Sequence, residues 1–347
     1  MTEQQNMLAE MVERFFAELM AAGMPASAAH ASDDPAWASL QQLGLCDIFL
    51  AEKDGGFGGT WQDAFVVFNQ LGAHALPLPL GETIVAKKLL LDAGMDCPNG
   101  AITLGCSSDG VLTDGGQRLN ASVDAVPWGN YASHMVLALA NSDELVLVET
   151  AAATQAHSYN NEANEPRCDL VFDNAPVLHR APQAAAVAAV MSAGALLRCC
   201  QSAGALASAL AMSVSYVNER VQFGRPLSKF QAVQHQLAIL AEEAAAVNCA
   251  AKAASLRADV GEAFFEVAAS KLRANRAVTK ATSIAHQAHG AIGFTQEHQL
   301  HFFTQRLWAW RSEFGNDRYW AQFLGRQVLA AGADNFWSDL TARSDSD

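Results

Sequence analysis

Charged residues are scarce in this sequence, and basic residues are the scarcer kind. Asp, Glu, Lys and Arg make up 17% of the 347 residues, and 22 basic residues stand against 36 acidic ones, for a formal net charge of −14. A nucleic-acid-binding protein normally shows a basic patch or a high pI. The pI of 5.1 therefore argues against a nucleic-acid partner. An anionic ligand would need local Arg or Lys side chains to hold it against the overall field.

Cysteines at metal-binding or redox spacing are also missing. The seven cysteines are an odd number, and no two of them form a Cys-x-x-Cys pair. Neither a disulfide framework nor a zinc site is predicted, and we expect no metal cofactor. Small buried thiols in a reducing compartment are the expected alternative, which favours a cytoplasmic location.

Long apolar runs are absent as well. The first residues, Met1 to Asn6, are polar and lack the basic start and apolar stretch of a secretory signal. The richest apolar stretch, 184–197, is mostly alanine and too short to span a bilayer. We therefore expect no membrane partner.

Apolar residues are nevertheless abundant, at 51% of the chain. That is enough for a large core, and the length suggests two or three domains. Many of these residues are alanines, which favour helices and let helices pack closely. The composition therefore favours a mostly helical protein.

The first hundred residues, 1–100, predict a small helical domain. Apolar residues recur at helical spacing over 4–23, and further helices are expected at 35–43, 61–72 and 81–93. A short apolar piece at 45–50 leads into a glycine-rich loop at 54–60.

From residue 101 the pattern changes to short apolar or alternating runs separated by Gly, Asp, Asn and Ser. Such runs predict strands joined by turns. They lie at 101–104, 111–113, 122–126, 135–139 and 145–148, and we expect 169–173 to be the last strand. Residues 101–180 therefore predict a compact β domain.

Helical periodicity dominates again from residue 183. Helices are expected at 183–218, from 228 onward, at 262–288, at 297–311 and at 317–333, the last of them. Residues 181–347 therefore predict a C-terminal helical bundle. The predicted fold class is mainly α with a central β domain.

The most informative stretch, Arg220 to Leu227, lies where two of these helices meet. It places a cation, an aromatic residue, a glycine and a proline inside a long apolar segment. A guanidinium offers a planar fork to phosphate, and glycine lets a ligand approach closely. A second interpretation stays open, in which Arg220 is a helix C-terminal charge and Gly224 is the left-handed cap.

Five segments, in this order, resemble the acyl-CoA dehydrogenases, a family of FAD-dependent flavoproteins. They are Leu50–Thr60, Leu71-Gly72 with the prolines after it, Val126–Gly129, Arg220–Ala238 and Gln287–Phe294. The last is similar to the family's Gln-x-x-Gly-Gly-x-Gly-Phe. The resemblance implies an N-terminal helical domain, a β barrel-like middle domain, and a C-terminal helical bundle with FAD and subunit contacts.

The resemblance also implies which residues touch FAD. In the family, the segment that matches Arg220–Ala238 reaches a cofactor that is bound mainly by a neighbouring subunit. The segment that matches Gln287–Phe294 approaches the pyrophosphate of that cofactor. The implied contacts are Arg220, Gln222, Phe223, Gly224, Leu227, Phe230, Gln231, Gln287, Gly290 and Ala291. Ala291 stands where the family usually has glycine. Taken alone, 287–294 could equally be an ordinary helix–turn–helix link.

The family's reaction is the α,β-dehydrogenation of an acyl-CoA thioester. A carboxylate removes the α-proton while a hydride leaves the β-carbon for flavin N5. The base normally precedes a Gly-Thr-like pair. Aligning glycine on Gly315 puts Phe314 in that position, and a slip of one residue puts Glu313 there, so Glu313 is the candidate base. It could equally be a solvated carboxylate at a helix end.

Two further departures bear on the function. The alternative base position that some members use falls on Gly194, and only a remnant of the flavin-side stretch stands at Cys106–Gly110. These losses resemble a branch of the family in which two unlike subunits assemble and only one supplies the full active site. Such pairs often act on bulky substrates such as steroid side-chain CoA esters.

Two functions therefore stay open. The chain is either a subunit that performs the acyl-CoA dehydrogenation, or a non-catalytic partner that completes the FAD site and substrate channel of a sister chain. The resemblance implies an acyl-CoA substrate, an electron-transferring flavoprotein as acceptor, and a homo-oligomer or an α2β2 heterotetramer.

Overall fold

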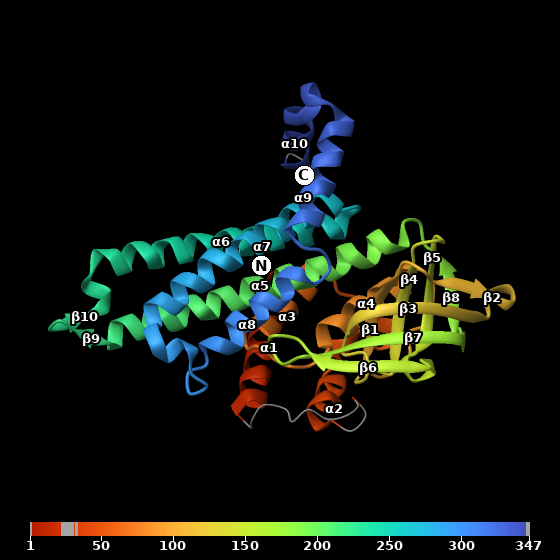
Figure 1. The fold of residues 1–347 in the computed structure, drawn as a ribbon, viewed down its shortest axis with the longest axis horizontal. Coiled ribbons are helices and arrows are strands. Elements are labelled where there is room, and N and C mark those ends of the chain that lie inside the picture. The colour runs from red at the N-terminus through yellow and green to blue at the C-terminus, as the bar shows by residue number, and fades with distance from the viewer. Residues whose placement is uncertain (1, 22–30, 32–33, 345–347) are drawn as a thin grey trace.

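The computed structural model describes residues 2–21, 31 and 34–344. Along the chain, four helices are followed by two small sheets and then by a long helical region that ends in a projecting pair of helices (Figure 1). The β region lies at one end of the molecule, and the start of α6 (Gln231–Val260) lies at the other end (Figure 1). The expected fold class, mainly α with a central β region, is confirmed.

Four helices form the N-terminal region: α1 (Glu3–Ala21), α2 (Pro35–Gln42), α3 (Trp61–Ala73) and α4 (Leu80–Asp92). Helix α3 begins at a capping box in which Thr60 and Asp63 bond each other's backbone N–H. The short apolar piece at 45–50 is not a strand. Among the described residues no strand pairs with it, and its backbone N–H groups bond to nearby carbonyls, from Asp47 N–H to the Gly44 carbonyl and from Leu50 N–H to the Asp47 carbonyl.

The β region contains two four-stranded sheets, in the orders β1-β4-β5-β8 and β2-β3-β7-β6. Their bounds are β1 (Ile102–Ser107), β2 (Val111–Thr113), β3 (Arg118–Pro127), β4 (His134–Leu139), β5 (Glu144–Glu149), β6 (Gln155–Asn160), β7 (Pro166–Pro176) and β8 (His179–Pro182). Side chains such as Leu137 and Val146 from one sheet and Val123 and Phe172 from the other share a buried cluster, so the sheets pack face to face. The expectation that 169–173 is the last strand is wrong, because β8 follows and pairs with β5.

The C-terminal region is built around one long helix, α5 (Ala186–Glu219), which packs against α3, α6, α7 and α8. A two-stranded hairpin, β9 (Val221–Gln222) and β10 (Arg225–Pro226), links it to α6 (Gln231–Val260). Then follow α7 (Phe264–His289), α8 (Leu300–Ser312), α9 (Asp317–Ala331) and α10 (Phe336–Ser344). The prediction that the helix at 317–333 is the last one is wrong, since α10 follows it after Gly332.

Helix α5 is, within the described residues, the one helix that is long and apolar enough to cross a membrane. However, 72% of its apolar window is buried inside the protein, against the helices that surround it. We therefore interpret α5 as the central helix of a protein core.

One apolar core runs through most of the chain. It includes Phe68 of α3, Leu104 of β1, Leu197 of α5 and Leu307 of α8. The elements change from helix to strand after residue 92 and back after residue 182. The division at 1–100, 101–180 and 181–347 stays a prediction, because this core crosses both boundaries.

Candidate functional site

The Arg220–Leu227 stretch forms a tight hairpin at one end of the helical region (Figure 1). Gln222 pairs with Arg225, and the two turn residues, Phe223 and Gly224, both have positive φ, at 52° and 76°. Two central residues of positive φ are typical of a type I′ hairpin turn. Gly224 therefore belongs to this turn, and the helix ends five residues earlier, at Glu219 with Arg220 as its C-cap. The alternative in which Gly224 caps the helix is wrong.

The hairpin presents an aromatic side chain to solvent. Phe223 is 90% exposed, although its backbone lies in the left-handed region that a residue with a large side chain rarely adopts. Behind it, Phe230 packs edge-on against Phe223 and lies under the Arg225 guanidinium at 4.1 Å. An exposed aromatic residue in a strained turn is a feature of ligand and subunit contacts.

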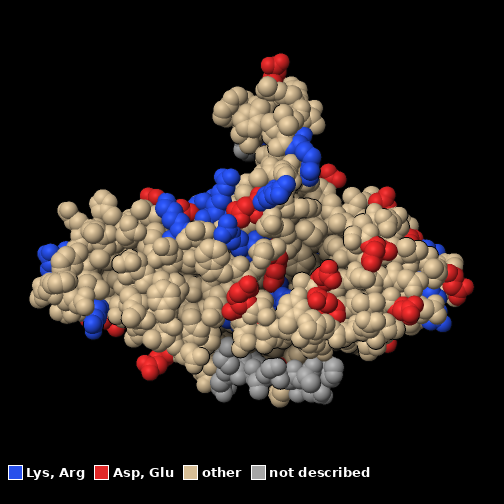
Figure 2. Space-filling view, in the orientation of Figure 1, with Lys and Arg blue, Asp and Glu red and all other residues tan. Residues whose placement is uncertain are grey.

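Polar side chains around the hairpin have unused hydrogen-bonding capacity. Arg220, Gln222 and Gln231 are exposed. Within the described part of the chain, the Arg220 guanidinium has no carboxylate within ion-pair distance. Figure 2 shows a few basic side chains at this end of the molecule, with acidic side chains near them. Guanidinium and amide donors beside an aromatic ring fit the pyrophosphate and adenine of a dinucleotide.

The second predicted segment lies at the C-terminal end of α7. Gln287 is exposed on the last turn of the helix, and Gly290, with φ of 65°, starts a 3-10 turn over Gly290–Phe294 that includes Ala291. A Cβ at Gly290 would meet no other atom, so this backbone borders open space. The helix–turn–helix geometry of the alternative is present, and it leaves the turn accessible to a ligand.

The two predicted cofactor segments lie at the same end of the protein. Tyr216, one turn before Arg220 in α5, stacks on His289 of α7 with ring centroids 4.8 Å apart. The structure therefore brings together the ends of α5 and α7, and with them Arg220 and Gly290.

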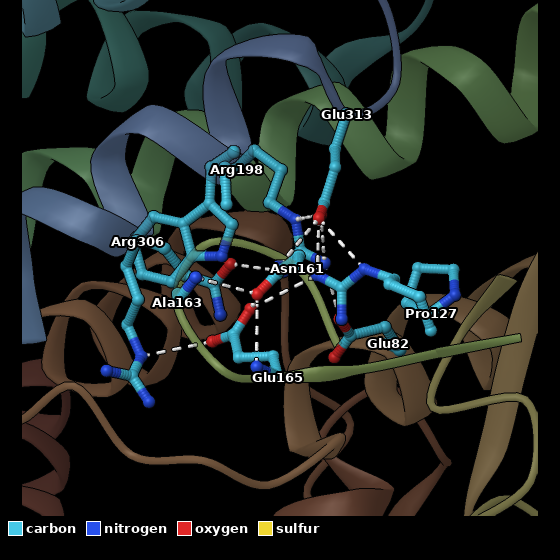
Figure 3. A network of polar contacts seen from close by, with 12 residues as sticks. Glu82, Pro127, Asn161, Ala163, Glu165, Arg198, Arg306 and Glu313 are labelled. Carbon is cyan, nitrogen blue, oxygen red and sulfur yellow. Dashed lines mark hydrogen bonds and ion pairs between the residues drawn. The ribbon is translucent and has the colours of Figure 1, made fainter. Parts of the chain in front are cut away.

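Glu313 lies elsewhere, at the C-terminal end of α8 facing the β region (Figure 3). Its carboxylate accepts a hydrogen bond from Arg167 Nε at 3.0 Å and one from Arg198 Nε at 2.8 Å. The side chain is 16% exposed. The position at a helix end was expected, but the solvated carboxylate of that alternative is wrong, because two buried arginines bind it.

The ion pairs around Glu313 extend to a balanced network of three arginines and three glutamates. Arg198 also donates to Glu82 at 2.6 Å, Arg167 donates to Glu165 at 3.1 Å, and Arg306 pairs with the other oxygen of Glu165 at 3.0 Å (Figure 3). Gln201 accepts from Arg198 at 2.6 Å. The buried charges cancel and nearly all their hydrogen bonds are made, as buried ion pairs require.

This network sets the charge state of Glu313. Burial alone would raise the pKa of the carboxyl, but the charges of Arg167 and Arg198 and their hydrogen bonds outweigh it and lower the pKa from its ordinary value of 4.5 to about 2. A general base works best with a pKa near the working pH. A carboxylate that is bound by two guanidinium groups is therefore poorly suited to remove a proton.

The two positions that the family resemblance assigns to a base lie in contact with each other. A Cβ built on Gly194 of α5 would collide with the ring of Phe314. The Phe314 backbone has positive φ, at 49°, and its ring also lies under the Arg198 guanidinium at 5.7 Å. Two positions that can serve the same substrate carbon should be neighbours, and here neither carries a carboxylate.

Sequence reasoning did not find the partners of Glu313. Arg198 stands alone in an alanine-rich helix, and Glu82 lies in a helix that is buried on nearly every side. A single charge inside an apolar segment is a signal for a buried ion pair, but it does not identify the partner. Among the described residues, no group of three or more His, Cys, Asp and Glu side chains could hold a metal ion.

Models of one protein family match both terminal regions of the chain. Residues 2–96 match the acyl-CoA dehydrogenase N-terminal domain, and residues 184–329 match the acyl-CoA dehydrogenase C-terminal domain. The chain is 28% identical over 323 residues to acyl-CoA dehydrogenase IpdE2 of Mycobacterium tuberculosis, covering 88% of this chain and 91% of that protein. The IpdE2 protein of Mycolicibacterium smegmatis is 27% identical, covering 79% and 81%.

Solved structures of similar fold include two protein complexes. The Tcur3481-Tcur3483 steroid ACAD G363A variant superimposes with a TM-score of 0.84 at 25% identity, covering 96% of this chain and 99% of that chain. The ChsE4-ChsE5 complex from Mycobacterium tuberculosis gives a TM-score of 0.86 at 18% identity, covering 96% and 99%. Since both terminal domains of the family match and the fold extends over nearly the whole chain, this chain belongs to the acyl-CoA dehydrogenase family of oxidoreductases.

Proposed function

We propose that this chain serves FAD-dependent acyl-CoA dehydrogenation as the partner subunit that completes the cofactor site of a sister chain. The observation that carries the proposal is the contact between Phe314 and Gly194, the two family positions for a base. The nearest carboxylate, Glu313, is bound by Arg167 and Arg198. The chain keeps side chains suited to bind a cofactor and lacks a carboxylate suited to abstract a proton.

The described side chains fit one half of a flavin dinucleotide site. The Arg220 guanidinium would bind a phosphate oxygen, the Gln222 and Gln287 amides would hydrogen-bond the dinucleotide, and Phe223 would pack against a flat ring. All four side chains are exposed, so the rest of the site has to come from another subunit. FAD, when bound, accepts the hydride that leaves the substrate β-carbon.

The similar complexes favour a heteromer, and we propose an α2β2 heterotetramer over a homo-oligomer. One similar structure is the Tcur3481-Tcur3483 steroid ACAD, which pairs two protein names. We extend this to a bulky, steroid-derived acyl-CoA as the substrate class. An electron-transferring flavoprotein as acceptor and a cytoplasmic location complete the proposal.

The first test is the visible flavin spectrum of the chain purified alone and co-purified with its neighbouring gene products. We expect the chain alone to be colourless and a complex with a sister subunit to be yellow. A complex that contains no flavin would contradict the proposal. Normal flavin content and turnover by the chain alone would instead support the second candidate, a self-sufficient dehydrogenase.

Arg220→Gln tests the cofactor contact directly. Loss of a charge-assisted hydrogen bond to a phosphate should weaken FAD binding by the complex by about 10- to 100-fold, as measured by flavin titration. Arg14→Gln is the matched control, since it removes the same charge from an exposed side chain of α1. Equal FAD affinity in both variants would remove Arg220 from the site.

A further inference from the structure

A cluster of aromatic rings and imidazoles lies directly behind the two proposed cofactor segments. This ring cluster consists of Tyr216 in α5, His286 and His289 in α7, Phe294 in the 3-10 turn and His298 just before α8. His289 stacks on Tyr216 at 4.8 Å and meets His298 edge-on at 4.6 Å. His286 stacks on Phe294 at 4.2 Å. The reaction proposed above uses none of these side chains.

The ring cluster is the direct mechanical link between the segments. The Tyr216 carbonyl accepts the Arg220 backbone N–H at 2.9 Å, so Tyr216 lies in the last turn before the hairpin. His289 is adjacent to Gly290 in the chain. The Tyr216–His289 stack therefore joins the last turn of α5, next to Arg220, to the end of α7, next to Gly290.

His289 is held in its neutral form by its contacts. Its Nδ1 lies 2.8 Å from the Ala285 carbonyl oxygen, and since a carbonyl can only accept, Nδ1 carries the proton. The residue is 3% exposed, and within the described residues its Nε2 is buried without a hydrogen-bond partner. A second proton would sit on Nε2 with no acceptor, which buried charges do not tolerate.

The groups that face His289 provide no negative charge to pair with an imidazolium. Tyr216 faces it from α5, His298 from the segment before α8, and His286 from its own helix. None of them is a carboxylate, and His298 opposes a positive charge. Burial lowers the pKa of His289 below its ordinary value of 6.5, the Ala285 hydrogen bond opposes this shift, and His298 adds to it.

We propose that Tyr216 and His289 are positioning residues whose ring stack holds the Arg220–Gln231 segment against the Gln287–Ala291 turn, and that protonation of His289 releases this stack. The statement that both segments bind one cofactor rests on the proposed function. The release itself rests on the geometry of this chain alone.

The direction of the pH dependence follows from the lowered pKa. The open form binds a proton on His289 with the ordinary pKa of 6.5, and the packed form binds it only at lower pH. The packed form therefore has its full stability above pH 6.5 and loses it as the pH falls from 6.5 towards the lowered pKa. Each pKa unit between the two forms changes the packing equilibrium about tenfold.

Hydrogen–deuterium exchange of residues 285–299, expressed as protection factors, tests this without any flavin. Wild-type protection should fall, by at most about tenfold for one titrating histidine, between about pH 7.5 and about pH 5.5. His289→Leu removes the titrating ring of the stack, so its protection should fall by less than that of the wild type, although His286 and His298 in the same segment still titrate with lowered pKa values. His179→Leu, an exposed histidine of β8, is the control and should behave as the wild type.

Tyr216→Ala supplies a second measurement, because it removes the stack and leaves His289 in place. Protection of residues 285–299 should then be low at both pH values. Constant wild-type protection, or a fall of the same size in His289→Leu, would overturn the proposal. Failure of a co-purified complex to bind FAD at any pH, with the exchange results as expected, would refute the proposed function and leave the link between α5 and α7 standing.

Discussion

Glu313→Gln should lower the free energy of unfolding by about 3–5 kcal/mol. The variant keeps the size of the side chain but leaves Arg167 and Arg198 buried without the carboxylate that both of them bind. Removing one partner from a buried ion pair leaves an uncompensated charge, which is far more costly than losing an exposed pair. A urea unfolding curve measures the change through its midpoint. Glu162→Gln is the control, since Glu162 is exposed in the turn between β6 and β7.

The same variant separates a structural role of Glu313 from a catalytic one. If the sister subunit supplies the base, turnover of the folded complex should remain within a few-fold of wild type at temperatures well below unfolding. Loss of a catalytic base would instead lower kcat by about 10²–10⁴-fold or more, with little change in the unfolding midpoint. That second pattern would restore Glu313 as the base.

Acid should act on the same group. The pKa of Glu313 lies at about 2 in the folded protein, against an ordinary value of 4.5. A carboxyl with a depressed pKa stabilises the fold above its ordinary pKa, and this contribution is lost as the pH falls from 4.5 to about 2. Below pH 4.5, wild-type stability should therefore decline more steeply than that of Glu313→Gln, which lacks this group.

Much of the helical part of the fold was readable from periodicity because helices such as α6 bury one stripe of apolar side chains, here Leu240, Ala244, Val247 and Ala251. The missed strands lack such a signal. All six residues of β6 are exposed, and its sequence, Gln155-Ala156-His157-Ser158-Tyr159-Asn160, does not alternate. Strand β8 has four residues and includes one buried alanine. Both strands are held by backbone hydrogen bonds to a neighbouring strand. Residue types alone do not predict such pairing.

The proposed cofactor segments could be identified from the sequence because their residues are consecutive, so that a short motif contains each of them. The environment of Glu313 was not, because it is assembled from distant parts of the chain. Arg198 and Arg167 are 115 and 146 residues away along the sequence. The alignment that puts Phe314 and Gly194 at the base positions was available from the sequence. The contact between the two residues, which supports that alignment, is visible only in the folded chain.

Gly204→Ala should be the second highly destabilising substitution, at about 3 kcal/mol or more. Helices α3 and α5 cross with their backbones in close approach. A Cβ on Gly204 would lie under 3.0 Å from backbone atoms of Asn69 and Ala73, and one on Gly72 would lie equally close to the backbone of Gln201. These neighbours are main-chain atoms of helices, so they cannot rotate away as a side chain would.

Gly325→Ala is the matched control for this crossing. Gly325 lies within α9, and a Cβ there would meet no atom within 4 Å. Alanine is the better helix former, so this variant should be more stable by about 0.5–1 kcal/mol. A loss below about 1 kcal/mol in Gly204→Ala would mean that α3 and α5 can separate freely. Because α5 carries Gly194 and Arg198 and ends at the hairpin, a displaced α5 should also weaken FAD binding by the complex, whereas Gly325→Ala should not.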